Sequence, residues 1–455
     1  MTGQAADVRF GRLERRGMLL GLSGIQLAMV GSALVVVVAA GMATGPAGLA
    51  LTAPAWAAAL AVALVQIGGR PMVEVLPVAG PWAARRALRR TEVLAAPVAN
   101  PVLTIPGVPG RLRIAVDSPS GAGVIRPAAR GATACTVVAR VHGRGLLLEA
   151  AASQDRRVAG WGRLLGSLSQ LPHVTGVQVL HRNAPHGGSG IARWWAEQPR
   201  TGAWASRIVA DLVEDTANSA QIDTLLAVSL RLRRGIEVDA VLRSLSEAFD
   251  GADLDLEAWL TPPQIASVFR SAYDPTAAGM TLGSSWAPMG IAEAWGDARS
   301  DSGFHATFWI SEWPRSAAHP SFLRGLLLAP GAYRTFSLTA QPLPTGKALR
   351  EIRRARAEQV ADASTRARVG RVEDEASRAA AEELTRREED LIAGHGDLRF
   401  TGLISVTATT REELEDACAS LQSSAGQAGC ELRRLVGQQV QAFAVAALPL
   451  ARVLA

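Results

Sequence analysis

The feature that most constrains this chain is a long uncharged stretch near its beginning. No charged residue occurs in 17–69, a run of 53 residues. As a single helix this run would be about 80 Å long, whereas the hydrocarbon core of a bilayer is about 30 Å thick. The segment Thr44-Gly45-Pro46 interrupts the run near its middle. The sequence therefore predicts a transmembrane hairpin with two spans, at about 18–43 and 47–68.

A cleavable signal peptide is the competing interpretation, because Ala55-Trp56-Ala57 has the A-x-A pattern of a cleavage site. The apolar stretch before it is much longer than the roughly 7–15 residues of a signal-peptide core, which argues against cleavage. Arginines flank the two predicted spans, and the turn between the spans has none. They are Arg9, Arg12, Arg15 and Arg16 before the hairpin, and Arg70, Arg85, Arg86, Arg89 and Arg90 after it. By the positive-inside rule, we expect a two-pass protein of the inner (cytoplasmic) membrane with both termini in the cytoplasm.

A basic segment soon after the second span is the predicted membrane-interface site. It comprises Trp82 and four arginines at helical spacing, Arg85, Arg86, Arg89 and Arg90. A tryptophan beside clustered arginines is typical of a helix that lies on anionic lipid. The alternative is a solvated linker whose charges only enforce the topology.

The charge of the rest of the chain argues against a nucleic-acid interface. The net charge is +6, and residues 1–90 account for all of it with nine arginines and three acidic residues. The remainder carries 38 basic and 38 acidic residues. Excess basicity therefore flanks the membrane segment and does not form a phosphate-binding surface. The three cysteines, Cys135, Cys418 and Cys430, lack the spacing of a zinc site and are expected to be buried thiols.

The fold class predicted for the chain is α+β: the transmembrane hairpin, then a cytoplasmic domain of repeated β-α-β units with a charged helical hairpin. Recurring pairs of strand patterns joined by a helix pattern suggest a mixed sheet with helices on one side. The expected parts are the hairpin (1–70), a juxtamembrane basic segment and linker (71–131), an α/β domain (132–345), the charged helical hairpin (346–393) and a C-terminal β-α-β unit (394–455). The charged hairpin is expected to turn near Gly370, and 431–446 to be mostly extended. Whether this hairpin is a solvated arm or binds a partner stays open.

Motifs for catalysis are missing from the sequence. A Walker A loop needs Gly-Lys-Ser/Thr, but the single lysine, Lys347, is followed by Ala348, and Gln341 replaces the first glycine. No G-x-S-x-G, H-E-x-x-H or paired C-x-x-C occurs. We therefore predict no catalytic, cofactor-binding or metal-binding residue. The first suspects for an unmarked site are Glu293, Asp297, Asp301 and His305, although turn residues at a strand entry explain them as well.

Several strings in the second half carry a resemblance to known membrane proteins. The chain resembles a family of actinobacterial membrane proteins found in conjugation and type IV secretion loci (PrgI-like neighbourhoods). The strings are 303–315 (GFHATFWISEWPR), 322–323 (FL) and 333–337 (YRTFS). Further strings are similar to the end of the N-terminal domain of VirB-type secretion ATPases: 400–407 (FTGLISVT), 412–414 (EEL), 442–443 (AF) and 448–450 (LPL).

The resemblance implies a non-enzymatic, inner-membrane structural subunit of a conjugative or type IV-like secretion machine. In VirB-type ATPases a motor domain follows the Leu-Pro-Leu string, so the resemblance implies that a separate cytoplasmic ATPase docks on this chain. The implied partners are the lipid bilayer, other membrane subunits of the machine and further copies of the chain. Two alternatives stay open: the two-span membrane subunit of a type VII secretion apparatus, and a membrane-anchored enzyme with an unmarked pocket.

Overall fold

The computed structural model describes residues 24–67, 70–94, 102–116, 119–129, 131–142, 150–185, 195–198, 204–217, 220–232, 237–252, 254–277, 287–314, 322–328, 332–343, 345–368, 375–392 and 397–454. These residues form two compact units. The smaller unit contains 24–92 with 436–438, and the larger contains 93–435 with 439–454. A long apolar helix near the N-terminus followed by a large antiparallel sheet with helices confirms the α+β class.

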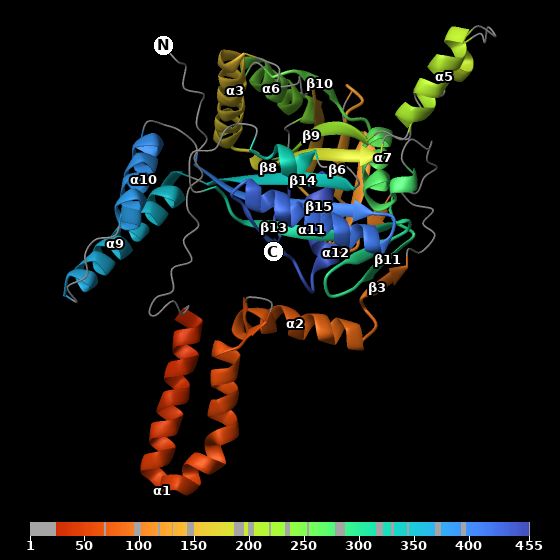
Figure 1. Ribbon diagram of the computed structural model, residues 1–455. Coiled ribbons are helices and arrows are strands. Elements are labelled where there is room, and N and C mark those ends of the chain that lie inside the picture. Colours follow the sequence, from red (N-terminus) through yellow and green to blue (C-terminus); the bar gives the residue numbers. More distant parts are fainter. Residues whose placement is uncertain are drawn as a thin grey trace. The chain divides into compact units, whose positions relative to one another are not determined.

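The smaller unit contains the apolar segment. Its elements are α1 (Gly24–Leu64), β1 (Gln66–Ile67), β2 (Arg70–Pro71) and α2 (Met72–Ala87). Hydrogen bonding makes α1 continuous, but Gly45 has φ 64° and ψ −145°, outside the helical region. Glycine adopts this conformation at low cost because it has no Cβ. At this point the ribbon reverses direction, so the two halves of α1 run side by side (Figure 1).

The larger unit is built on one 14-stranded sheet. Its strands are β3 (Glu92–Leu94), β4 (Val102–Thr104), β5 (Arg111–Val116), β6 (Gly123–Pro127), β7 (Ala134–Val141), β8 (Val174–Pro185), β9 (Ala220–Arg231), β10 (Leu256–Trp259), β11 (Gly290–Glu293), β12 (Ala298–Ser300), β13 (Gly303–Glu312), β14 (Tyr333–Leu343), β15 (Asp397–Ala408) and β16 (Glu431–Arg434). Its helices are α3 (Ala151–Gln170), α5 (Trp204–Ala217), α6 (Val238–Gly251), α7 (Pro262–Tyr273), α8 (Arg324–Leu327), α9 (Thr345–Arg368), α10 (Glu375–Ile392), α11 (Arg411–Gln427) and α12 (Gln439–Ala447), with a 3-10 turn at Pro275–Ala277.

The sheet consists of two repeats of the same topology. In the first repeat, β7-α3-β8 and β9-α6-β10 give the strand order β10-β7-β9-β8. In the second, β13-α8-β14 and β15-α11-β16 give the order β16-β13-β15-β14. In both, a strand of the other pair lies between two strands that a helix connects, which is the split β-α-β topology of ferredoxin-like folds. Each repeat is preceded by a hairpin (β5-β6 or β11-β12) and followed by a helix (α7 or α12).

The repeats are joined through equivalent strands. β8 pairs with β14 in antiparallel register, with Leu180 opposite Ser337. An antiparallel contact between equivalent strands relates the repeats by an approximate two-fold axis. The connection after β8 carries α5, and the equivalent connection after β14 carries α9 and α10. Because β8 and β14 run in opposite directions, these two connections leave from opposite ends of the sheet.

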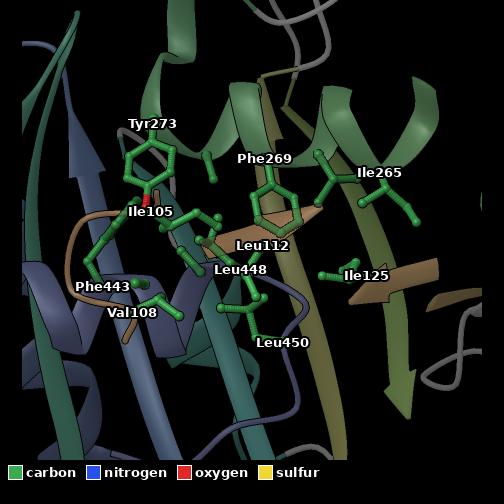
Figure 2. Close-up of a cluster of buried hydrophobic side chains, with 14 of the residues drawn as sticks. Ile105, Val108, Leu112, Ile125, Ile265, Phe269, Tyr273, Phe443, Leu448 and Leu450 are labelled. Carbon is green, nitrogen blue, oxygen red and sulfur yellow. The ribbon is translucent and has the colours of Figure 1, made fainter. Parts of the chain in front are cut away.

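Helices cover both faces of the sheet, as alternate residues of β9 show. Leu225 belongs to the same buried cluster as Phe269 of α7, whereas Leu226 belongs to the cluster that contains Leu245 of α6. Figure 2 shows the first cluster, in which Phe269 of α7 lies beside Leu112 of β5, and Tyr273 of α7 lies beside Phe443 of α12. Successive strand side chains point to opposite faces, so a strand covered on both faces must be apolar at most positions.

Four details of the predicted fold are wrong. The sheet is not mixed, since every strand pair with a described register is antiparallel. Its helices are not on one side only. Residues 102–127 are not a linker, because they form β4, β5 and β6. Finally, 431–446 is extended only as far as Arg434, and α12 begins at Gln439.

Candidate functional site

The smaller unit contains the candidate membrane anchor. Among the described residues, Ile25–Leu64 is the one helix long and apolar enough to cross a membrane. A helix of this kind near the N-terminus fits a membrane anchor or a signal sequence. The predicted arginines Arg9, Arg12, Arg15 and Arg16 lie outside the described residues.

A buried polar side chain links the two halves of α1. Gln26 is 8% exposed, and its Nε2 donates a hydrogen bond to the carbonyl oxygen of Ala63 at 2.8 Å. An amide without a partner in hydrocarbon costs several kcal/mol, so this bond favours the closed hairpin over separated halves. The sequence analysis did not single out Gln26. The available signal was a polar side chain within the uncharged run.

The segment that follows forms the amphipathic helix α2. No residue of α2 is buried, and Figure 1 shows it crosswise to the two halves of α1 in the same unit. The guanidinium of Arg86 lies 5.2 Å from the ring centroid of Trp82, which is a cation–π distance. Arg85 and Arg86 are in the last turn, where positive charge is favoured by the helix dipole.

The C-terminus of α2 has an unusual residue at its cap. The amide of Arg90 donates to the carbonyl of Arg85 at 2.7 Å, and the amide of Arg89 donates to that of Arg86 at 3.0 Å. This pair of bonds is the Schellman motif, which requires a left-handed residue at the position of Arg89 (φ 52°). Glycine is usual there, and another residue costs roughly 1–2 kcal/mol. A strained residue where glycine would serve better points to a function for the arginine charge.

The five predicted interface residues do not all have the same surroundings in the structure. Arg86, Arg89 and Arg90 are exposed, and Trp82 is half-buried beside Arg86. Arg85 is half-buried instead, and its Nη2 donates at 2.6 Å to the carbonyl oxygen of Gly437, which belongs to the same compact unit. The exposed cluster of Arg86, Arg89 and Arg90 is the candidate lipid-headgroup site. Sequence spacing alone does not separate Arg85 from these three.

Replacing Arg86, Arg89 and Arg90 by glutamine is expected to weaken binding of anionic lipid. Each basic residue near an anionic surface contributes about 1 kcal/mol, so partitioning of a nanodisc-held protein toward phosphatidylserine-containing vesicles should fall by about 100-fold. The matched control replaces Arg111, Arg113 and Arg243, which are exposed in the larger unit, and leaves partitioning unchanged. Equal losses in both triple variants would mean that only net charge matters, and would contradict a specific site at α2.

The four suspected catalytic residues do not form one site. Asp297 pairs with Arg411, whose Nη2 lies 2.9 and 2.8 Å from the two carboxylate oxygens. Glu293 accepts a hydrogen bond from the amide of Val440 at 3.2 Å, at the start of α12. Each carboxylate therefore stabilises a different contact within the fold.

Asp301 has a structural role at the turn between β12 and β13. Its φ is 35°, and its Oδ1 accepts hydrogen bonds from the amides of Met289 (2.9 Å) and Gly290 (3.2 Å). Its Oδ2 lies 2.6 Å from Nη1 of Arg270. Arg270 also pairs with Asp274 at 2.5 Å, so one guanidinium of α7 joins two carboxylates.

Hydrogen bonding also lowers the pKa of Asp274 in this network. Burial by itself would raise the pKa, but hydrogen bonds from Ser302 and Thr276 and the charge of Arg270 outweigh it, and the pKa lies below the ordinary value. The carboxylate is therefore held in its ionised form as part of the turn.

His305 has the partners of a catalytic histidine but the wrong proton arrangement. Its Nε2 lies 2.6 Å from Oγ of Ser300, and its Nδ1 lies 2.9 Å from Oγ1 of Thr407. Ser300 donates its own proton to the carbonyl oxygen of Tyr273 at 2.7 Å. While the Ser300 proton is used in this bond, Nε2 is the donor to Ser300 and does not act as the base that activates this hydroxyl.

The surroundings of His305 exclude solvent. Its side chain is 0% exposed, its ring centroid lies 4.1 Å from that of Phe443, and burial lowers its pKa to about 3. Ser300 is 1% exposed. A substrate has no access to this pair in the structure, so the pair works as a buried polar link between β12, β13 and β15.

Neither a metal-binding cluster nor a related protein assigns a function to the described residues. Within the described part of the chain, no group of three or more His, Cys, Asp or Glu residues is arranged to hold a metal ion. No protein-family model and no curated protein sequence matches the chain. The exposed arginine cluster beside the apolar helix is therefore the strongest candidate site.

Proposed function

We propose that this chain is a non-enzymatic membrane scaffold of a conjugative or type IV-like secretion machine. The observation that carries the membrane part is the α1 hairpin, which turns at Gly45 and is linked by the Gln26–Ala63 hydrogen bond. The amphipathic helix α2 and its exposed arginines support an anchor that also contacts lipid headgroups. The secretion role rests on sequence strings in the second half of the chain, which resemble membrane proteins of conjugation and type IV secretion loci.

In this proposal the double-repeat body is held at the cytoplasmic face of the inner membrane and docks a separate ATPase. The two-span subunit of a type VII apparatus has the same general layout, so it remains the alternative machine.

Cysteine labelling tests the proposed topology. Thr44 is exposed at the turn of α1, and Ala87 is exposed at the end of α2. We expect Thr44→Cys to react with a membrane-impermeant maleimide in intact cells, and Ala87→Cys to react only after lysis. The three native cysteines are buried, and burial raises the pKa of Cys418 and Cys430 to about 11, so their background reaction should be low.

Two outcomes would contradict this topology. Labelling of Ala87→Cys in intact cells would place α2 outside. Loss of residue 44 from the mature chain, measured by intact mass, would mean that the apolar helix is a cleaved signal sequence.

Purification from native membranes tests the scaffold role. The tagged full chain is extracted in mild detergent, and co-purifying proteins are identified by mass spectrometry against an equally tagged, unrelated two-span protein. We expect stoichiometric recovery of a Walker-containing ATPase and of other membrane subunits, and the ATPase family distinguishes a type IV from a type VII machine. Recovery of the chain alone as a monodisperse species would contradict the scaffold and favour a membrane-anchored enzyme.

A further inference from the structure

The two repeats carry different helices in their equivalent inserted connections. In the second repeat, α9 and α10 pack against each other, and a small buried cluster at their base includes Ile352 and Leu391. Arg356 of α9 pairs with Glu388 of α10 at 2.6 Å. The predicted turn of this charged hairpin, at Gly370, lies outside the described residues. In this connection each helix therefore covers apolar side chains of an antiparallel neighbour.

In the first repeat, α5 carries a row of exposed apolar side chains. Trp204 is 72% exposed, Ile208 46% and Leu212 62%. A spacing of four residues places these three on one side of the helix. None of the side chains described for α5 is buried, so this helix is not packed into a core in the way that α6 and α7 are.

An exposed row of this kind does not stabilise a helix in water. α5 has 14 residues, and isolated helices shorter than about 12–15 residues are only marginally stable unless an apolar face is packed. Large apolar side chains that lie together on a surface are typical of a contact site. The row on α5 therefore points to a partner that covers it.

The charges of α5 run against its own dipole. Arg207, its only basic residue, lies in the N-terminal half of the helix. The acidic residues Asp211, Glu214 and Asp215 follow toward the C-terminus. A helix favours acidic residues at its N-terminus and basic residues at its C-terminus, so this order is unfavourable for a single helix. A second α5 in antiparallel orientation places its acidic end beside the basic end of the first, and there the same order is favourable.

We propose that α5 pairs with α5 of a second copy of this chain, in antiparallel orientation, about a two-fold axis near Ile208. In this pair Ile208 lies opposite Ile208 of the second copy, and Trp204 lies opposite Leu212 of the second copy. The apolar row of each helix is then covered by the same row of the other. The contact uses one surface patch twice, as closed two-fold interfaces do.

The charged flank of the row fits the same register. Arg207 and Asp211 are exposed, and neither forms an ion pair with another described residue. At 100° per residue both lie on one side of the apolar row, and this two-fold axis brings equal sides of the two helices together. With a rise of about 1.5 Å per residue, Arg207 and Asp211 of the second copy are displaced by only about 3 Å along the helix axes. Two symmetric ion pairs therefore form in the register that the apolar row selects.

A second copy fits α5 better than a lipid surface does. α5 carries one basic and three acidic residues, whereas helices that bind anionic lipid are basic. The pairing also gives the first repeat an antiparallel helix pair, which the second repeat forms within one chain. The contact does not depend on the secretion role: its absence leaves the proposed anchor and ATPase docking untouched, and recovery of the chain without an ATPase leaves the α5 pair intact.

Cysteine cross-linking in native membranes tests the two-fold axis. Because a residue at the axis lies beside its own copy, we expect full-length Ile208→Cys to give a disulfide-linked dimer on mild oxidation, at a yield at least about tenfold above the control. The control is Val360→Cys, which replaces an exposed apolar residue of α9. The three native cysteines are buried and should add little background.

Exchange of the two flanking charges tests the register. Arg207→Asp and Asp211→Arg each place like charges opposite each other, and each variant should dimerise at least about tenfold more weakly in mass photometry of the detergent-solubilised full chain. The double variant exchanges both charges in both copies and should dimerise like the wild type, which also shows that the substitutions leave the fold intact. Arg243→Asp, at an exposed position of α6, is the matched control and should leave the dimer unchanged.

Several results would overturn this pairing. They are the absence of a cross-link through Ile208→Cys, single variants that dimerise like the wild type, and a double variant that does not regain the dimer. A further one would assign the row to lipid. This is a monomeric protein in phosphatidylcholine nanodiscs whose bimane label at Ile208→Cys is quenched by nitroxide lipids.

Discussion

Acidification from pH 7.5 to pH 5 is expected to reduce the free energy of unfolding by about 2 kcal/mol through His305 alone. Burial lowers the pKa of this histidine to about 3 in the folded protein, against about 6.5 in the unfolded chain. Below pH 6.5 the unfolded state binds a proton that the folded state does not, so stability falls as the pH falls. At about 1.4 kcal/mol per pH unit, the loss is roughly 4 kcal/mol at pH 3 and approaches roughly 5 kcal/mol below it.

Urea unfolding of the full chain in detergent, followed by tryptophan fluorescence at several pH values, measures this effect. Carboxylates titrate in every variant, so the difference between wild type and His305→Asn isolates the histidine. We expect a flatter pH dependence for His305→Asn, whereas His142→Asn, which removes an exposed histidine, should follow the wild type. Parallel curves for wild type and His305→Asn would show that His305 has the same pKa in the folded and the unfolded chain, and would contradict the buried, neutral arrangement.

Most helices and strands of the larger unit could be predicted from the sequence because their apolar residues recur with a clear period. In α6, the buried residues recur at helical spacing: Val238, Val241, Leu242, Leu245 and Phe249. Strands such as β7 and β9 read as short apolar runs because both of their faces are covered. Strand pairing could not be derived in the same way. Local patterns identify a strand-helix-strand unit, but they do not tell whether a third strand is inserted between its two strands, and this insertion is what makes the sheet antiparallel.

The elements that the sequence analysis did not predict show no clear helical or strand periodicity of apolar residues. α12 is buried on all sides except at Gln441, so it has no polar face, and its Val and Ala residues resemble an extended core segment. β5 and β6 lie among glycines and prolines that are typical of linkers, yet Leu112 and Val124 are almost completely buried. These strands are stabilised by distant partners, which a local pattern does not reveal.

The candidate membrane site could be predicted in its composition but not in its detail. The break at Gly45 and the arginines after the apolar run follow from residue types alone. The engagement of Arg85 by Gly437 is a contact between residues 352 positions apart in sequence, and only the fold creates it. The left-handed conformation of Arg89 is hidden as well, because arginine is not a residue that signals such a cap.

Gly107→Ala is expected to destabilise the protein by about 2–5 kcal/mol, and it tests whether the supposed linker belongs to the core. Gly107 has φ 81°, and a Cβ there would lie 2.7 Å from Cα and 2.8 Å from N of Gln441 in α12. The left-handed conformation costs alanine roughly 1–2 kcal/mol, and the collision with backbone atoms adds about 1–3 kcal/mol of overpacking. Ile105 and Val108, on either side, are buried in the cluster that contains Phe443 (Figure 2).

Gly110 provides a matched control for this substitution three residues further on. Its φ is 86°, but a Cβ there would meet open space. Gly110→Ala should therefore lower the free energy of unfolding by only about 1 kcal/mol, through the left-handed backbone conformation. Urea unfolding of both variants in detergent, referred to wild type, separates the collision from the backbone strain. A larger loss for Gly107→Ala means that α12 is held between the sheet and the segment around Gly107. Equal losses would mean that this segment yields freely and that α12 does not depend on it, in contradiction to the close contact of Gly107 with Gln441.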